Sequence, residues 1–104
     1  MEELKLEVKI LSIEELERAN KEFQPKFNSA HEAYSILKEE IEEAAEELKF
    51  INGNLDHLWI CTKRNIHESA IEHAKDMKEN AINLSAEAIQ VAAMAQKFID
   101  SFEK

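Results

Sequence analysis

The sequence contains almost none of the residues that interrupt helices. Its 104 residues include a single glycine, Gly53, and a single proline, Pro25. With one glycine the chain has no glycine-rich loop to cradle phosphates, which excludes P-loop and Rossmann nucleotide sites. The remaining composition is rich in Glu, Ala, Leu, Ile and Lys, as is typical of long helices. The sequence therefore predicts an all-α protein.

Disulfides, membrane-length apolar runs and excess positive charge are also missing. The single cysteine, Cys61, excludes an internal disulfide framework and favours a reducing, intracellular setting. No apolar stretch approaches a membrane span, and the acidic N-terminus does not resemble a signal peptide, so we expect a cytoplasmic protein. The net charge of −9 argues against nucleic-acid and membrane partners, because both are anionic. An anionic substrate would need a metal ion or a local group of Lys and Arg.

The N-terminal third carries mixed signals. Residues 3–10 alternate polar and apolar side chains with a period of two, which locally resembles a strand. No second strand-like run is available, so this segment could pair with its own copy, extend a helix or remain loose. Ser12 and Glu15 have the spacing of a capping box and predict a first helix from 13 to about 23. Pro25 ends it. These signals divide the chain into an N-terminal segment, 1–11, and one helical domain, 12–104.

Caps and stops predict three more helices, giving a bundle of about four. Ser29 and Glu32 form a second capping box, and the helix that follows should end at Asn52–Gly53. Asn54 can cap a short helix carrying apolar residues as far as Ile66. The segment "KRNIHES" predicts a break, and the last helix should run from about Glu68 to Phe102.

The last predicted helix is apolar on two faces. The sequence contains an unbroken heptad stripe: Ala70, Ala74, Met77, Ala81, Leu84, Ala88, Val91, Ala95, Phe98 and Phe102. Ile71, Ile82 and Ile89 form a second stripe on roughly the opposite side. A helix that is apolar on two faces is buried on both. We expect a homodimer or homotetramer to cover the second stripe; the alternative is that the first helix and the N-terminal segment cover it.

Glutamates crowd the second predicted helix, where six of residues 36–50 are Glu. Neighbouring like charges three or four residues apart cost about 0.2–0.5 kcal/mol per pair on a helix. A helical projection sends half of these glutamates to solvent and stacks Glu40, Glu43 and Glu47 on one flank of the apolar stripe. On the last helix the matching flank carries Asn80, Asn83, Glu87, Gln90 and Met94.

Antiparallel packing of these two helices would make the two flanks border one groove. Three carboxylates and an amide would then converge, and such oxygen ligands suit Mg²⁺ or Mn²⁺. Glu40, Glu43, Glu87 and Gln90 are the candidate metal ligands. The alternative is charge that is simply solvated at the edge of a bundle. The four histidines include no H-x-x-x-H or E-x-x-H pair, which disfavours a di-iron bundle.

The strings "HEAYSILKEEIEEAAEEL" and "AEAIQVAAMAQKFI" resemble the MazG-like, all-α nucleotide pyrophosphohydrolases, in particular the small phage- or prophage-type members. The family pattern is E-x-x-E on one helix and E-x-x-D on a later one. Here Glu40 and Glu43 match the first motif, Glu87 begins the second, and Gln90 replaces its aspartate. The resemblance covers roughly residues 20–102.

The resemblance implies hydrolysis of a nucleoside triphosphate to the monophosphate and pyrophosphate, with Mg²⁺ held on the phosphates by acidic side chains. Glu47 would be a further ligand or the catalytic base. The candidate contacts to the substrate are Lys63, Arg64, Lys75, Lys78, Asn83 and His31. A non-catalytic helical interaction module, or a family member that has lost activity, is the competing hypothesis, and the glutamine at position 90 favours it.

Overall fold

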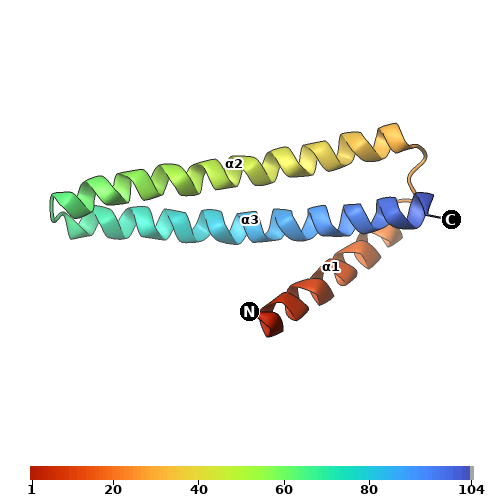
Figure 1. Cartoon of the computed structure of the whole chain (residues 1–104), viewed down its shortest axis with the longest axis horizontal. Helices are drawn as coiled ribbons and strands as arrows, with labels where there is room; N and C mark the ends of the chain where they lie inside the picture. The colour runs from red at the N-terminus through yellow and green to blue at the C-terminus, as the bar shows by residue number, and fades with distance from the viewer. Residues whose placement is uncertain (104) are drawn as a thin grey trace. The chain divides into compact units, whose positions relative to one another are not determined.

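The computed structural model describes residues 1–103 and contains three helices in that range. They are α1 (Glu2–Glu22), α2 (Ala30–Lys63) and α3 (His67–Phe102) (Figure 1). The described residues include no strand, so the expected all-α class is confirmed. The expected number of about four helices is wrong, because the second and third predicted helices are one continuous helix. Among the described residues, no helix has the length and apolar character that crossing a bilayer requires.

The strand-like segment 3–10 is helical and forms the first half of α1. Of the three possibilities for this segment, helix extension is the correct one, because a helix satisfies its backbone hydrogen bonds without a partner strand. The predicted cap at Ser12 is wrong: its hydroxyl lies inside α1 and donates to the carbonyl of Lys9 (2.7 Å). The predicted end before Pro25 is confirmed, since α1 gives way to extended backbone at Phe23.

Helix α2 begins at the predicted cap and continues through the predicted stop. The backbone N–H of Glu32 donates to the hydroxyl of Ser29 (3.1 Å), which confirms the cap at Ser29. The Glu32 carboxylate accepts from the backbone N–H (3.3 Å) and the amide (3.0 Å) of Asn28, one residue earlier than a capping box requires. The predicted stop at Asn52–Gly53 is wrong, because Gly53 does not adopt the left-handed conformation of a helix end. Asn54 caps nothing; its amide donates to the carbonyl of Phe50 one turn earlier (3.1 Å). A glycine inside a helix costs only about 1 kcal/mol, which the packing of a long helix easily outweighs.

The break between α2 and α3 lies where the sequence places it. Residues 64–66 form a tight turn, in which Asn65 takes a positive φ of 56°. Asparagine tolerates this left-handed conformation better than most residues. Helix α3 then runs uninterrupted to Phe102, as expected.

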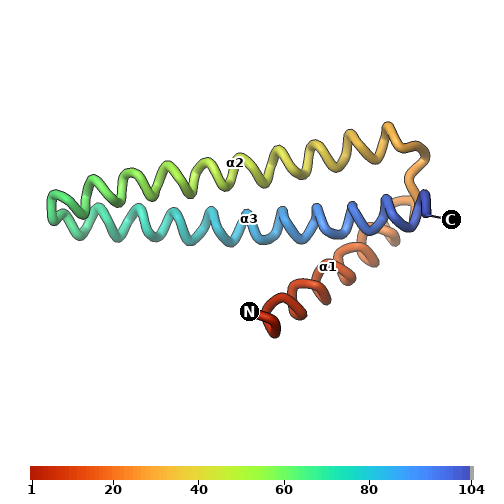
Figure 2. The backbone as a smooth tube through the Cα atoms, viewed as in Figure 1, coloured from red at the N-terminus to blue at the C-terminus, as the bar shows by residue number. Residues whose placement is uncertain are grey.

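The chain forms two compact units, described here separately. One contains α1, the start of α2 as far as Glu42 and the end of α3 from Glu87. The other, Glu43–Ala86, is a helical hairpin in which the rest of α2 runs antiparallel to the start of α3 (Figure 2).

The inward faces of α2 and α3 are more polar than the sequence suggests. On α3 the less exposed positions that recur every three or four residues are Ala70, His73, Met77, Asn80, Leu84, Glu87, Val91, Met94, Phe98 and Ser101. From Ile89 onward a second set is also half-buried or buried, namely Ile89, Gln90, Ala93, Ala95 and Lys97. Six of the ten predicted stripe residues are therefore correct, namely Ala70, Met77, Leu84, Val91, Ala95 and Phe98. Ala74, Ala81, Ala88 and Phe102 are exposed, and the residues that precede the three alanines face inward instead. On α2 the same shift turns Glu40, Glu47 and Asn54 inward.

That shift leaves apolar side chains uncovered. Tyr34, Ile41, Leu48 and Leu55 recur every seven residues along α2 and are 48–66% exposed. The buried apolar residues are Ala19, Phe27, Ala33 and Ala93, and no large side chain among the described residues is fully buried. The core of the single chain is thus small.

Candidate metal site and adjoining cavity

The inward-facing polar residues pair across the two long helices. In the hairpin unit, the amide of Asn80 donates to Glu47 Oε2 (3.1 Å), and His73 Nδ1 lies 3.0 Å from Asn54 Oδ1. Asn54 also donates to Asn80 Oδ1 (3.2 Å), which joins the two pairs. The imidazole of His57 stacks on His73 with ring centroids 5.1 Å apart. Because these side chains hydrogen-bond to one another, the cost of burying their polar atoms between two helices is largely offset.

In the first unit, Glu40 of α2 and Glu87 of α3 form the equivalent layer. Gln90 bridges them: in the amide orientation that satisfies both of its polar atoms, its nitrogen donates to Glu40 Oε2 (2.8 Å) and to Glu87 Oε2 (3.2 Å). Both carboxylates are half-buried. Hydrogen bonds to ionised acceptors are stronger than neutral ones, so the amide offsets part of the repulsion between the two glutamates.

Glu43 follows Glu40 by one helical turn on α2 and adds a third carboxylate. Glu40, Glu43 and Glu87 each offer an oxygen, and these three oxygens lie within 4.8 Å of one another. Glu43 is exposed, whereas the other two are half-buried. The structure thus brings three of the four expected metal ligands together, and Gln90 contacts two of them through its nitrogen rather than its oxygen.

The donor set fits a hard divalent cation. Oxygens bound to one Mg²⁺ at about 2.1 Å in octahedral geometry lie about 3–4 Å apart, so the carboxylates need to approach one another only slightly. Three carboxylates and an amide supply the oxygen ligands that Mg²⁺ and Mn²⁺ prefer. For Gln90 to join them, its amide must rotate to present Oε1. Exposed acidic groups also gather without binding an ion, so the geometry alone makes this a candidate site.

The remaining expected site residues are not members of this three-carboxylate cluster. Glu47 is half-buried and bound to Asn80. Lys63 lies at the end of α2 with its ammonium 5.4 Å from the centre of the Trp59 ring. Twenty residues of helix separate Lys63 from Glu43, which is about 30 Å, so neither it nor the adjacent Arg64 reaches this cluster within one chain. Four more are exposed on helix surfaces: Lys75, Lys78, Asn83 and His31.

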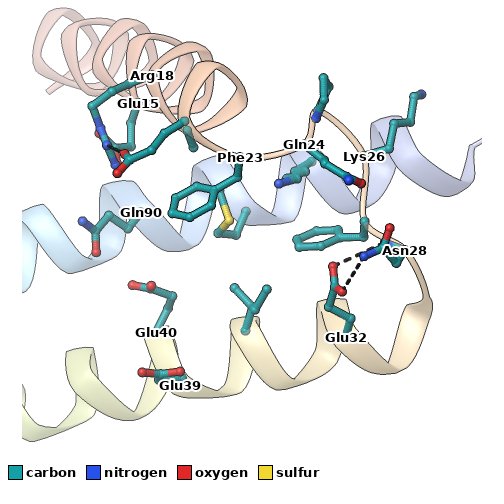
Figure 3. A pocket seen from close by; sticks show the side chains of 17 residues that line it. Glu15, Arg18, Phe23, Gln24, Lys26, Asn28, Glu32, Glu39, Glu40 and Gln90 are labelled. Carbon is teal, nitrogen blue, oxygen red and sulfur yellow. Dashed lines mark hydrogen bonds and ion pairs between the residues drawn. The ribbon is translucent and has the colours of Figure 1, made fainter.

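A cavity of about 820 Å³ opens beside the carboxylates within the first unit (Figure 3). Volumes of this order are typical of small-molecule sites. The walls come from α1, the segment between α1 and α2, the start of α2 and the end of α3. Glu39, Glu40 and Gln90 line one end, and Phe23, Phe27, Ile36 and Met94 supply apolar surface.

Three cationic side chains line this cavity, and two of them have oxygen partners. Arg18 binds Glu15 (2.6 Å) and Glu22 (2.7 Å), and its guanidinium hydrogen bond holds the pKa of Glu15 below the usual 4.5. Lys26 donates to the carbonyl of Asp100. Lys97 is only 6% exposed, and its ammonium lies 4.8 Å from the centre of the Phe27 ring. Within residues 1–103 the Lys97 ammonium forms no hydrogen bond or ion pair.

Sequence reasoning found the carboxylate cluster but missed the cavity. The cavity joins Phe27 to Lys97, which are 70 residues apart, so no local pattern marks it. One signal was present: Lys97 follows Gln90 by seven residues and therefore lies on the same face of α3. Comparison with protein-family models, with curated proteins and with solved structures finds no match to this chain.

Proposed function

We propose that the protein is a metal-dependent nucleoside triphosphate pyrophosphohydrolase of the MazG-like type. The observation that carries the proposal is the convergence of Glu40, Glu43 and Glu87, whose carboxylate oxygens lie within 4.8 Å of one another. Their arrangement matches the order and spacing of the two acidic motifs in the sequence. The reaction would be attack of water on the α-phosphorus, with cleavage of the bond to the bridging oxygen and release of pyrophosphate.

Each residue in the cluster has a defined role in this proposal. Glu40, Glu43 and Glu87 would hold the cation, and Gln90 would keep Glu40 and Glu87 in position through its amide. Glu47 lies one turn beyond Glu43 on α2 and is the candidate base that accepts the proton of the attacking water. A bound Mg²⁺ or Mn²⁺ would neutralise phosphate charge and lower the pKa of water.

Two copies of the chain would complete the bundle. The surface that a second copy would cover includes the exposed α2 stripe of Tyr34, Ile41, Leu48 and Leu55 and the α3 side chains Ile71 and Ile82.

The competing function, a non-catalytic helical module, also has an observation in its favour. Gln90 satisfies Glu40 and Glu87 by hydrogen bonding, so these two carboxylates do not depend on an ion. In a family pattern with aspartate at that position, the carboxylates would repel one another unless a cation were bound. The two hypotheses differ in one measurable respect, which is turnover.

A pyrophosphate-release assay over NTPs and dNTPs, with Mg²⁺ and with Mn²⁺, tests the proposal. Glu40→Gln, Glu43→Gln and Glu87→Gln should each abolish turnover and weaken Mn²⁺ binding. Glu42→Gln and Glu46→Gln change the same charge on the exposed side of α2 and should do neither. Absence of turnover with every nucleotide and both metals would favour the non-catalytic module. Equal loss from both sets of variants would show that the flank assignment is wrong.

A further inference from the structure

Within residues 1–103 the Lys97 side chain has no oxygen partner, although its residue is only 6% exposed. Its ammonium lies 4.8 Å from the centre of the Phe27 ring. The Lys97 nitrogen keeps solvent access, because among the described residues Asn20 Oδ1 is the one fully buried side-chain polar atom without a hydrogen-bond partner. Because Lys97 lines the cavity, a ligand there can supply the missing acceptor.

The position of Lys97 relative to the carboxylates fits the dimensions of a nucleotide. Gln90 and Lys97 are separated by two turns of α3, which is about 10 Å along the helix axis. Met94 lies between them on the same face and also lines the cavity. A molecule whose phosphates lie at Glu40 and Glu87 would therefore extend its sugar and base along this wall toward Lys97.

The chemistry of the walls favours a neutral aromatic group over a further phosphate. The cavity is lined by five glutamates, Glu15, Glu22, Glu32, Glu39 and Glu40, against three cations, two of which have oxygen partners. A second anionic group would be repelled by this excess of carboxylates. The exposed ring of Phe23 offers a stacking surface, and a single ammonium matches a single carbonyl oxygen.

We propose that this cavity binds the base of the nucleotide and that Lys97 selects bases with a carbonyl oxygen, such as hypoxanthine and guanine, over adenine. The proposal rests on the proposed function for the identity of the ligand as a nucleotide. An ammonium donates only, so the exocyclic amine of adenine would face it donor to donor. A site that hydrogen-bonds an acceptor disfavours the analogue that lacks it, because the bound ligand then displaces water from the ammonium without offering a partner in return.

Inosine and adenosine provide the test, since they have the same ring size and differ at the carbonyl position. Neither carries a phosphate, so binding is measured without metal, by NMR titration of the backbone amides of Phe27 and Asn28. We expect inosine to bind about tenfold more tightly than adenosine, a modest value for such discrimination. Lys97→Met keeps the length and apolar stem of the side chain and should make the two affinities equal, whereas Lys49→Met, an exposed lysine outside the cavity, should preserve the preference.

Phe23→Ala distinguishes stacking from hydrogen bonding, because it should weaken both nucleosides by the same factor. The proposal is overturned if neither nucleoside binds, if the wild-type protein binds both equally, or if the preference persists in Lys97→Met. The wild-type comparison stands even if a variant fails to fold. If inosine binds more tightly than adenosine but ITP releases no pyrophosphate, the hydrolase proposal is refuted and the base site stands. If ITP and ATP both release pyrophosphate but the two nucleosides bind equally, the hydrolase proposal stands and the base site is refuted.

Discussion

Gln90→Glu should destabilise the protein without metal and stabilise its metal complex. The substitution is isosteric, so it changes charge and hydrogen bonding while leaving packing nearly unchanged. In the amide orientation that satisfies both of its polar atoms, Gln90 donates to Glu40 Oε2 at 2.8 Å and to Glu87 Oε2 at 3.2 Å. Glutamate at this position removes both donors and adds a third carboxylate within hydrogen-bonding distance of two others.

The expected loss in the free energy of unfolding follows from the two contacts of the Gln90 amide. A hydrogen bond to a charged acceptor contributes about 1.5–3 kcal/mol, and repulsion between like charges about 4 Å apart is about 4 kcal/mol at an effective dielectric constant of 20. Solvent screening at half-buried positions and proton uptake by one carboxylate relieve much of this. We therefore expect a net loss of about 2–3 kcal/mol in the free energy of unfolding, which lowers the Tm of a chain of this size by roughly 10–20 °C.

With a bound cation, Gln90→Glu should stabilise the folded protein instead of destabilising it. A fourth carboxylate adds attraction to Mn²⁺, and after desolvation we expect about tenfold tighter binding, equivalent to about 1.4 kcal/mol. The Tm of Gln90→Glu should therefore rise more steeply with Mn²⁺ than that of the wild type, since a ligand that binds only the folded state stabilises it by mass action.

Thermal melts at fixed protein concentration, with EDTA and with increasing Mn²⁺, measure both effects. Gln96→Glu is the matched control, because Gln96 is an exposed residue of α3 whose amide donates to one carboxylate, Asp100 (2.8 Å). Exposed charge pairs contribute little, so its Tm should change by no more than a few degrees. If Gln90→Glu melts like the control in EDTA, the amide does not hold the two carboxylates. If Mn²⁺ raises both variants equally, Gln90 is not beside a metal site.

Three further outcomes follow from the structure. Gly53→Ala should raise the free energy of unfolding by about 0.5–1 kcal/mol in a denaturant titration, because Gly53 is helical and its added Cβ meets no atom within 4 Å; a loss of stability would mean that α2 breaks there. Ile82→Glu should convert a dimer to a 12 kDa monomer by light scattering, and Asn83→Glu, exposed on the adjacent face, should not; a monomeric wild type would remove the basis for the comparison. Because the Arg18 hydrogen bond lowers the pKa of Glu15, this contact stabilises the folded state above pH 4.5 and is lost as the pH falls through the lowered value, so wild type and Arg18→Gln should converge in Tm at low pH.

Much of the local structure could be predicted from the sequence. The scarcity of glycine and proline predicted the all-α class, and the helix cap at Ser29 and the break before α3 are where they were expected. These features depend on interactions between residues three or four apart, so a single sequence contains them. The grouping of Glu40, Glu43 and Glu87 was also accessible, because flank position on two helices follows from helical geometry.

The tertiary structure decided which of two adjacent stripes faces inward. Alanine packs almost equally well at either of two neighbouring positions, so the sequence could not distinguish Ala81 from Asn80 as the inward residue of α3. The inward choice depends on the opposite helix, where Glu47 provides the hydrogen-bond partner that Asn80 needs. Lys97 shows the same dependence. A lysine read alone predicts solvent exposure, and only the packing of Phe27, 70 residues away in the chain, buries its stem and leaves its ammonium at a cavity. Burial is a property of what the rest of the chain places beside a residue, and for these positions the local sequence does not contain it.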